Sequence, residues 1–212
     1  MTEQIKITME ALQKNRMQTF YAETKEDIMP IIKSLIGKGE TIAVGGSVTL
    51  DQIGAIEEFR NGDYAFIDRY KDGITLEERK KLFREAFFAD NFVTSSNAVT
   101  ENGELINVDG NANRVAAILY GPESVIVVVG ANKIVKDTAA GFERIRKIAA
   151  PKNVQRLNCK TYCAVNGECK GNSNIGSGCF SEQRICCDYV VSSFQRFENR
   201  IKVIICAEDL GY

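Results

Sequence analysis

Polar side chains that could bind an anion are concentrated between Thr94 and Arg114 of this 212-residue chain. The stretch is rich in Asn, Ser, Thr and Gly, whereas the flanking segments 89–93 and 125–129 are apolar. A polar, turn-rich segment between buried strands commonly holds the ligand site of an α/β protein. We therefore expect the functional site in this stretch.

Two cations near the expected strand ends suggest what that site binds. Arg114 closes the polar stretch, and Lys133 follows the apolar segment 125–130. An arginine grips a carboxylate or phosphate with two parallel hydrogen bonds, and a lysine adds a compact positive charge. Taken singly, surface salt bridges would explain both cations, and turn geometry would explain Asn97 and Asn111. Placed together at strand ends, these residues predict a pocket for a small anionic metabolite, a carboxylate or a phosphate.

The turn Gly45-Gly46-Ser47 separates a predicted strand at 40–44 from a predicted helix. Glycines there would let backbone N–H groups approach an anion, although an ordinary strand-to-helix turn with a serine N-cap explains the same residues. The turn lacks the full glycine pattern of a dinucleotide site, so NAD or FAD binding is not predicted. The predicted anion site comprises Gly45, Gly46, Ser47, Ser96, Asn97, Asn111, Arg114 and Lys133.

Candidate catalytic residues are fewer. The chain has no histidine, which excludes Ser-His-Asp and Cys-His catalysis. Asn97 and Asp109 are the candidates, but an asparagine is neither a proton acceptor nor a nucleophile at neutral pH. Glu101 is a nearby carboxylate that we expect to be solvated beside a turn. These residues leave open whether the protein is an enzyme.

Cysteines form a second candidate site near the C-terminus. The chain has seven cysteines, and thiols in a reducing compartment favour metal ligation or redox chemistry over structural disulfides. Four thiolates suit tetrahedral zinc or an iron–sulfur cluster equally well. The alternative is a loop of reduced thiols, or of thiols that oxidise on purification. The predicted ligands are Cys163, Cys169, Cys179 and Cys186, with Cys159 and Cys187 as substitutes, whereas Cys206 is expected in the core.

Bulk composition excludes several classes. The net charge of −1 gives no sign of a nucleic-acid or anionic-membrane surface. No apolar run approaches the ~20 residues of a membrane span, and the N-terminus is too polar for a signal peptide. The chain is therefore expected to be cytoplasmic.

Predicted helices and strands alternate along the chain, which favours an open, largely parallel sheet flanked by helices in one α/β domain, 1–212. An N-terminal helix at 1–20 carries a thin apolar stripe that suggests a homodimer. A β-hairpin is predicted at 99–108, with Asn102-Gly103 in a type I′ turn. Pro151 is expected to end a helix at 137–148. A cysteine-rich insertion at 159–187 precedes a last strand at 201–206.

Several segments resemble the lactate-utilisation (LUD) domain family: GGSVTL (45–50), TSSNAVTENGELINVDGNANRVA (94–116), GANKIV (130–135) and the RIC and EDLGY segments near the C-terminus. The likeness runs from about residue 20 to the end. It implies the fold of sugar-phosphate isomerases and CoA transferases, whose catalytic carboxylate lies in the segment that carries Ser96-Asn97 here.

The resemblance also implies a function. It suggests a component of, or accessory to, an iron–sulfur-containing redox system that oxidises lactate or a similar 2-hydroxy acid, with other redox-complex subunits as partners. It favours iron–sulfur over zinc for the cysteines. Two alternatives stay open: a non-catalytic metabolite-binding or assembly subunit, and a diverged sugar-phosphate isomerase or acyl-CoA transferase.

Overall fold

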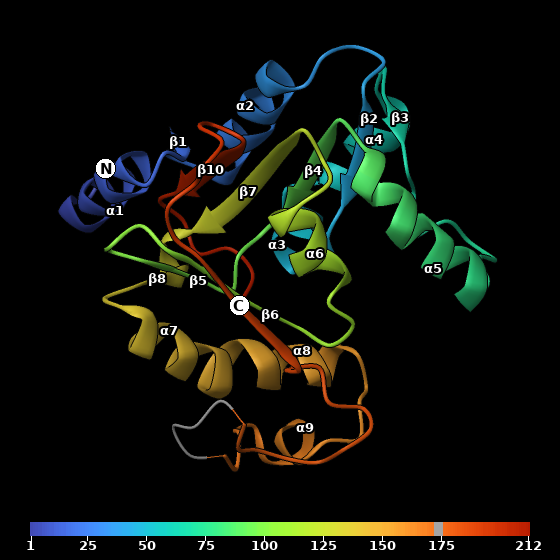
Figure 1. The fold of residues 1–212 in the computed structure, drawn as a ribbon, viewed down its shortest axis with the longest axis vertical. Coiled ribbons are helices and arrows are strands. Elements are labelled where there is room, and N and C mark those ends of the chain that lie inside the picture. The colour runs from blue at the N-terminus through green and yellow to red at the C-terminus, as the bar shows by residue number, and fades with distance from the viewer. Residues whose placement is uncertain (172–175) are drawn as a thin grey trace.

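In the computed structural model, which describes residues 1–171 and 176–212, a six-stranded parallel sheet forms the centre of the molecule (Figure 1). The strands of this sheet, in spatial order, are β1 (Gln18–Ala22), β10 (Ile201–Cys206), β7 (Ser124–Gly130), β4 (Asn91–Thr94), β2 (Thr41–Val44) and β3 (Ala65–Phe66). All neighbouring pairs run parallel. The central strands β7 and β10 are apolar runs, as burial on both faces requires. The predicted fold class is confirmed.

Helices cover both faces of this sheet. One face is covered by α2 (Ile28–Leu35), α3 (Val48–Gln52) and α4 (Ala55–Asn61), and the other by α1 (Glu3–Lys14) and α6 (Asn113–Leu119). Ile32 of α2 and Phe59 of α4 pack in one buried cluster with Ile126 and Val128 of β7. The helix α5 (Leu76–Glu85) lies at the β3 end of the sheet, opposite α1 (Figure 1).

A smaller sheet lies beside the first and carries the predicted hairpin. Its strands, in spatial order, are β8 (Ile134–Val135), β5 (Ala98–Thr100), β6 (Leu105–Asp109) and β9 (Asp188–Ser192). The helices α7 (Thr138–Arg144) and α8 (Ala150–Arg156) lie below it, and α9 (Tyr162–Asn166) lies lower still (Figure 1). Residues 172–175 of the predicted cysteine-rich insertion lie outside the described residues. Within the described chain, no helix has the length and apolar character needed to cross a membrane.

The hairpin forms as predicted, but its turn differs. Gly103 donates its N–H to the Thr100 carbonyl, and the Thr100 N–H donates to the Glu104 carbonyl. Gly103 alone of the Asn-Gly pair has a positive φ, of 80°. The connection is therefore a three-residue turn closed by a left-handed glycine, and not the predicted type I′ turn, which needs two positive φ angles.

The sequence predicts one helix over residues 1–20, and this prediction is wrong. The helix α1 ends at Lys14, and Arg16 adopts a left-handed conformation with φ 65° that turns the chain. The next residues form β1, an edge strand paired with β10. Residues 18–22 include a threonine and two aromatic residues, which suit a strand better than a helix.

Pro151 does not end the helix that precedes it, contrary to the prediction. A π-helical turn, Ile145–Ala149, joins α7 to α8, and Pro151 occupies the first turn of α8. A proline is tolerated in the first turn, where its missing N–H is not needed. The helical segment therefore continues to Arg156 and reaches the carboxyl edge of the large sheet.

Candidate functional site

A crevice lies at the carboxyl ends of the parallel strands, where open α/β sheets bind their ligands. Its inner cavity, of about 110 Å³, includes residues that follow three strands, such as Ser47 after β2, Ser95 after β4 and Lys133 after β7. The adjoining outer cavity, of about 180 Å³, includes Arg69 and Asn111. The polar residues that line both are Asn97, Asp109, Arg114, Asn153 and Arg156.

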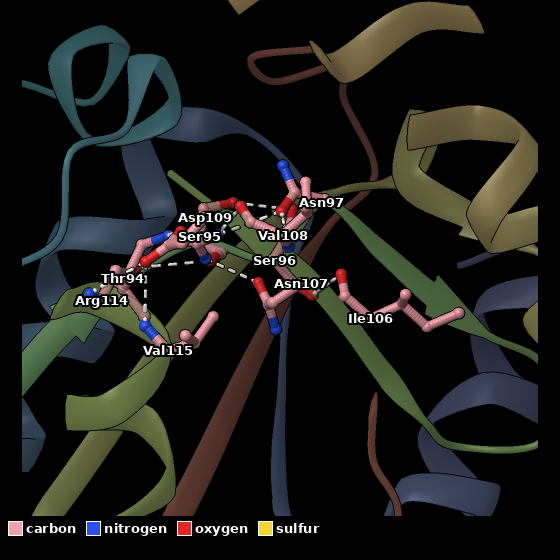
Figure 2. Close-up of polar contacts among 10 residues, drawn as sticks. All are labelled: Thr94, Ser95, Ser96, Asn97, Ile106, Asn107, Val108, Asp109, Arg114 and Val115. Atoms are coloured by element: carbon pink, nitrogen blue, oxygen red, sulfur yellow. Dashed lines mark hydrogen bonds and ion pairs between the residues drawn. The ribbon is translucent and has the colours of Figure 1, made fainter. Parts of the chain in front are cut away.

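Arg114 is the centre of a hydrogen-bond network that joins the loops around the crevice (Figure 2). Its guanidinium donates at 2.6–3.0 Å to a carboxylate, two side-chain amide oxygens and two backbone carbonyls, those of Asp109, Asn97, Asn107, Ser95 and Val108. A guanidinium has five N–H groups, and here each has an acceptor. Arg114 therefore has no N–H left for a ligand, so it holds the loops in place instead of acting as the predicted anion clamp.

Asp109 is committed to the same network. Its Oδ1 accepts from Arg114 Nε at 2.9 Å and lies 2.8 Å from Nη2, and both side chains are 10% exposed. Its Oδ2 accepts the backbone N–H groups of Arg114 and Val115, both at 3.0 Å, and so caps the start of α6. Both carboxylate oxygens of Asp109 are therefore engaged in holding Arg114 and the start of α6. Glu101, on the exposed hairpin turn, accepts a hydrogen bond from Gln4 of α1 and does not line the crevice.

Lys133, unlike Arg114, has fewer acceptors than N–H groups. The residue is 3% exposed, and its Nζ donates to the Thr49 hydroxyl at 2.8 Å and to the Ser95 hydroxyl at 2.9 Å. No carboxylate of the described residues lies within ion-pair distance. Burial, followed by the nearby charges of Arg144 and Arg114, lowers the pKa of Lys133 to about 7. An ammonium has three N–H groups, so one remains for a ligand in the inner cavity.

The amide oxygen of Asn97 belongs to the hydrogen-bond network, whereas its amide nitrogen is left for a ligand. Its Oδ1 accepts from the Val108 backbone N–H at 2.9 Å and from Arg114 Nη2. Its amide nitrogen points away from this network (Figure 2), and the residue lines both cavities. Arg144 fixes the backbone beneath it by donating to the Asn97 carbonyl at 2.7 Å. Asn97 thus presents a donor to a ligand, but no base.

The other predicted anion-site residues have mixed positions. The Ser96 hydroxyl bonds two backbone carbonyls and is buried, so it is structural. Ser47 caps α3, and Gly46 lines both cavities. A Cβ on Gly45 would lie 2.4 Å from Thr94 Oγ1, so Gly45 makes room for the network and does not line either cavity. Asn111 is exposed and lines the outer cavity only.

Several crevice residues were not predicted from the sequence. Asn153 and Arg156 were missed because Pro151 seemed to end their helix; Arg156 donates to the Asn153 amide oxygen and to the Tyr212 hydroxyl. Arg69 was missed because it lies in a loop without a recognisable motif. Thr49, inside the GGSVTL segment, could have been found from the helical spacing that places it one turn from the glycines.

The cysteine-rich segment brings four predicted ligands into one neighbourhood. Burial raises the pKa of the Cys163 thiol, and Cys179, Cys186 and Cys169 raise it further because they lie near it. All seven cysteines are free thiols, and the buried Cys206 belongs to the core, as predicted. Four thiols suit zinc or an iron–sulfur cluster. Among the described residues, no group of three or more ligating side chains is arranged to enclose a metal ion.

These features define an α/β protein with a parallel sheet and a cationic crevice at its carboxyl edge. The model of the LUD domain matches residues 5–206, and the chain therefore belongs to the LUD domain family.

Among solved structures, a DUF162 family protein from Deinococcus radiodurans is 15% identical, with a TM-score of 0.52 and coverage of 97% of each chain. The fold therefore extends over the whole length of both. The eIF2B delta subunit from Chaetomium thermophilum is 18% identical with a TM-score of 0.35, over 64% of this chain and 54% of that one. The eIF2B-beta2-delta2 complex from the same organism is 16% identical with a TM-score of 0.41, over 86% of this chain and 55% of that one. No curated protein sequence matches the chain.

Proposed function

We propose that this LUD-domain protein binds a small carboxylate, with lactate or a similar 2-hydroxy acid as the best candidate, within a redox system for lactate utilisation. The observation that carries the proposal is Lys133, a buried ammonium that faces the inner cavity without a carboxylate partner among the described residues. A buried charge that lacks a counter-charge is costly, and an anionic ligand would offset that cost.

The chemistry of a 2-hydroxy acid matches the donors around Lys133. Its carboxylate would accept the remaining N–H of the ammonium and the amide N–H groups of Asn97. The hydroxyl of Thr49 already accepts from Lys133 and can still donate to a ligand oxygen, whereas the hydroxyl of Ser95 donates to the Ser96 carbonyl. The crevice has no free carboxylate among the described residues, which argues against a proton-transfer or acyl-transfer reaction built on Asp109.

Binding can be tested by calorimetry with L-lactate, D-lactate, pyruvate and acetate. We expect L-lactate or pyruvate to bind the wild type and Lys133→Met to abolish binding while remaining folded. If none of these acids binds the wild type, or if Lys133→Met binds them equally well, the proposal fails. Lactate-dependent dye reduction by purified protein with its redox partners would separate an enzyme subunit from a binding or assembly subunit.

We also propose that Cys163, Cys169, Cys179 and Cys186 hold an iron–sulfur cluster, or zinc as the alternative, through which the protein contacts its redox partners. The support for this idea is that Cys169, Cys179 and Cys186 lie near enough to Cys163 to raise the pKa of its thiol. Metal analysis and a visible spectrum of protein purified without oxygen test it. Colourless protein that also lacks zinc would contradict both versions.

A further inference from the structure

We infer that the outer cavity binds a second anionic group, so that a 2-hydroxy acid with two anionic ends binds more tightly than lactate. The inference deepens the proposed function and rests on it, because it places a second charge on the ligand that Lys133 binds. It starts from Arg69, in the loop between β3 and α5, which lines the outer cavity.

The guanidinium of Arg69 has no acceptor among the described residues. It forms no hydrogen bond or ion pair with any residue that the structure describes, and its Nε is buried without a partner. Burial lowers the pKa of Arg69, which means that the surroundings disfavour its charge. Arg114, in the same crevice, has five acceptors. The difference indicates that the acceptor for Arg69 comes from a ligand.

Aromatic rings fix the position of this guanidinium. Its central carbon lies 4.4 Å from the centre of the Phe83 ring of α5 and 5.3 Å from that of Tyr70. Stacking on a ring holds the guanidinium plane and leaves its edge for hydrogen bonds. A Cβ built on Gly46 would lie 3.9 Å from Arg69 Nη2, so the arginine approaches the wall that both cavities share.

Further donors line the outer cavity beside Arg69. Arg156 also lines it and forms no ion pair among the described residues, and the amides of Asn111 and Asn113 face the same space. Asp109, the carboxylate that lines the crevice, is occupied by Arg114 and by backbone N–H groups. The outer cavity therefore presents two guanidinium groups, those of Arg69 and Arg156, that form no ion pair within the described part of the chain.

The two cavities are continuous, which sets the class of ligand. They share Gly46, Asn97 and Arg156, while Lys133 lines only the inner cavity and Arg69 only the outer one. A single acid could therefore place one carboxylate at Lys133 and a second carboxylate or a phosphate at Arg69. Planar guanidinium groups suit either anion because they donate two parallel hydrogen bonds.

Calorimetry with three probes tests this inference: L-lactate with one anionic group, and L-malate and 3-phosphoglycerate with two. We expect the wild type to bind at least one of the two-ended acids tenfold or more tightly than L-lactate. Arg69→Met should reduce that preference to about onefold and leave the affinity for L-lactate unchanged. Arg69→Lys, which keeps the charge but loses the planar donors, should retain part of the preference.

Arg84→Met is the matched control, because Arg84 is an exposed arginine of α5 that lines neither cavity. It should keep the full preference. A preference that survives in folded Arg69→Met, or a wild type that binds all three probes equally, would overturn the role of Arg69 and leave the proposed function intact. A wild type that binds none of them would overturn the proposed function as well.

Discussion

Replacing Arg114 with methionine should destabilise the protein strongly, because the side chain is structural. Methionine matches the aliphatic part of the arginine but removes all five donors. Asp109, 10% exposed, would lose its charged partner and keep only the two backbone N–H groups at the start of α6. The amide oxygens of Asn97 and Asn107 would each lose the same donor.

The expected loss is about 3–5 kcal/mol, the range found when one partner of a buried ion pair is removed. A domain of this size unfolds with roughly 5–15 kcal/mol, so the variant would keep only a part of its stability. At about 2–4 °C per kcal/mol, the midpoint of thermal unfolding should fall by roughly 6–20 °C. Such a fall is far larger than the effect of losing a surface charge.

Urea unfolding followed by circular dichroism, with Arg84→Met as the exposed control, measures this loss. A double-mutant cycle with Asp109→Asn adds a second readout. Because both variants break the same contact, the double variant should lose less than the sum of the single variants, by about 1–3 kcal/mol. A loss below about 1 kcal/mol for Arg114→Met, the value typical of exposed pairs, would refute the structural role and restore Arg114 as a candidate ligand residue.

Three other predictions concern the same edge of the sheet. Only the protonated form of Lys133 attracts an anion, and the pKa of Lys133 is lowered to about 7. The affinity for L-lactate, measured by calorimetry, should therefore be constant below about pH 6 and fall about tenfold per pH unit above about pH 8. An affinity that does not change up to about pH 9 would exclude Lys133 as the contact. Gly45→Ala should lower the free energy of unfolding in urea by about 1–3 kcal/mol, because the new Cβ would lie 2.4 Å from Thr94 Oγ1. Gly46→Ala is the control and should leave stability unchanged, because its Cβ would lie 3.6 Å from its nearest neighbour, the Tyr70 hydroxyl. Equal losses in the two variants would contradict the packing at Gly45. Ala112→Gly should raise stability by about 0.5–1 kcal/mol because Ala112 has φ 56°, and a loss would show that its side chain makes a contact of greater value.

The sequence predicts the central strands of the large sheet well because they are continuous apolar runs between polar turns, but it misses the edge strand β1, which is not one. It predicts less where tertiary contacts decide the conformation. Pro151 is a strong signal for a helix end, but the π-helical turn before it moves the proline into a position that tolerates it. That local adjustment depends on packing against the small sheet, which no pattern in residues 137–156 reveals, and it brings Arg156 to the site.

The position of the site was predictable, and the roles of its arginines were not. Arg114 and Arg69 are the same residue type, and a sequence cannot show which acceptors surround each one. Arg114 follows a stretch full of amide and carboxylate oxygens, and those oxygens take all its donors. Arg69 packs against aromatic rings, which fix a guanidinium but cannot satisfy its N–H groups. The polar stretch therefore shapes the crevice mainly by bonding to itself, and the positive charge that remains for a ligand comes from Lys133, Arg69 and Arg156, on other segments of the chain.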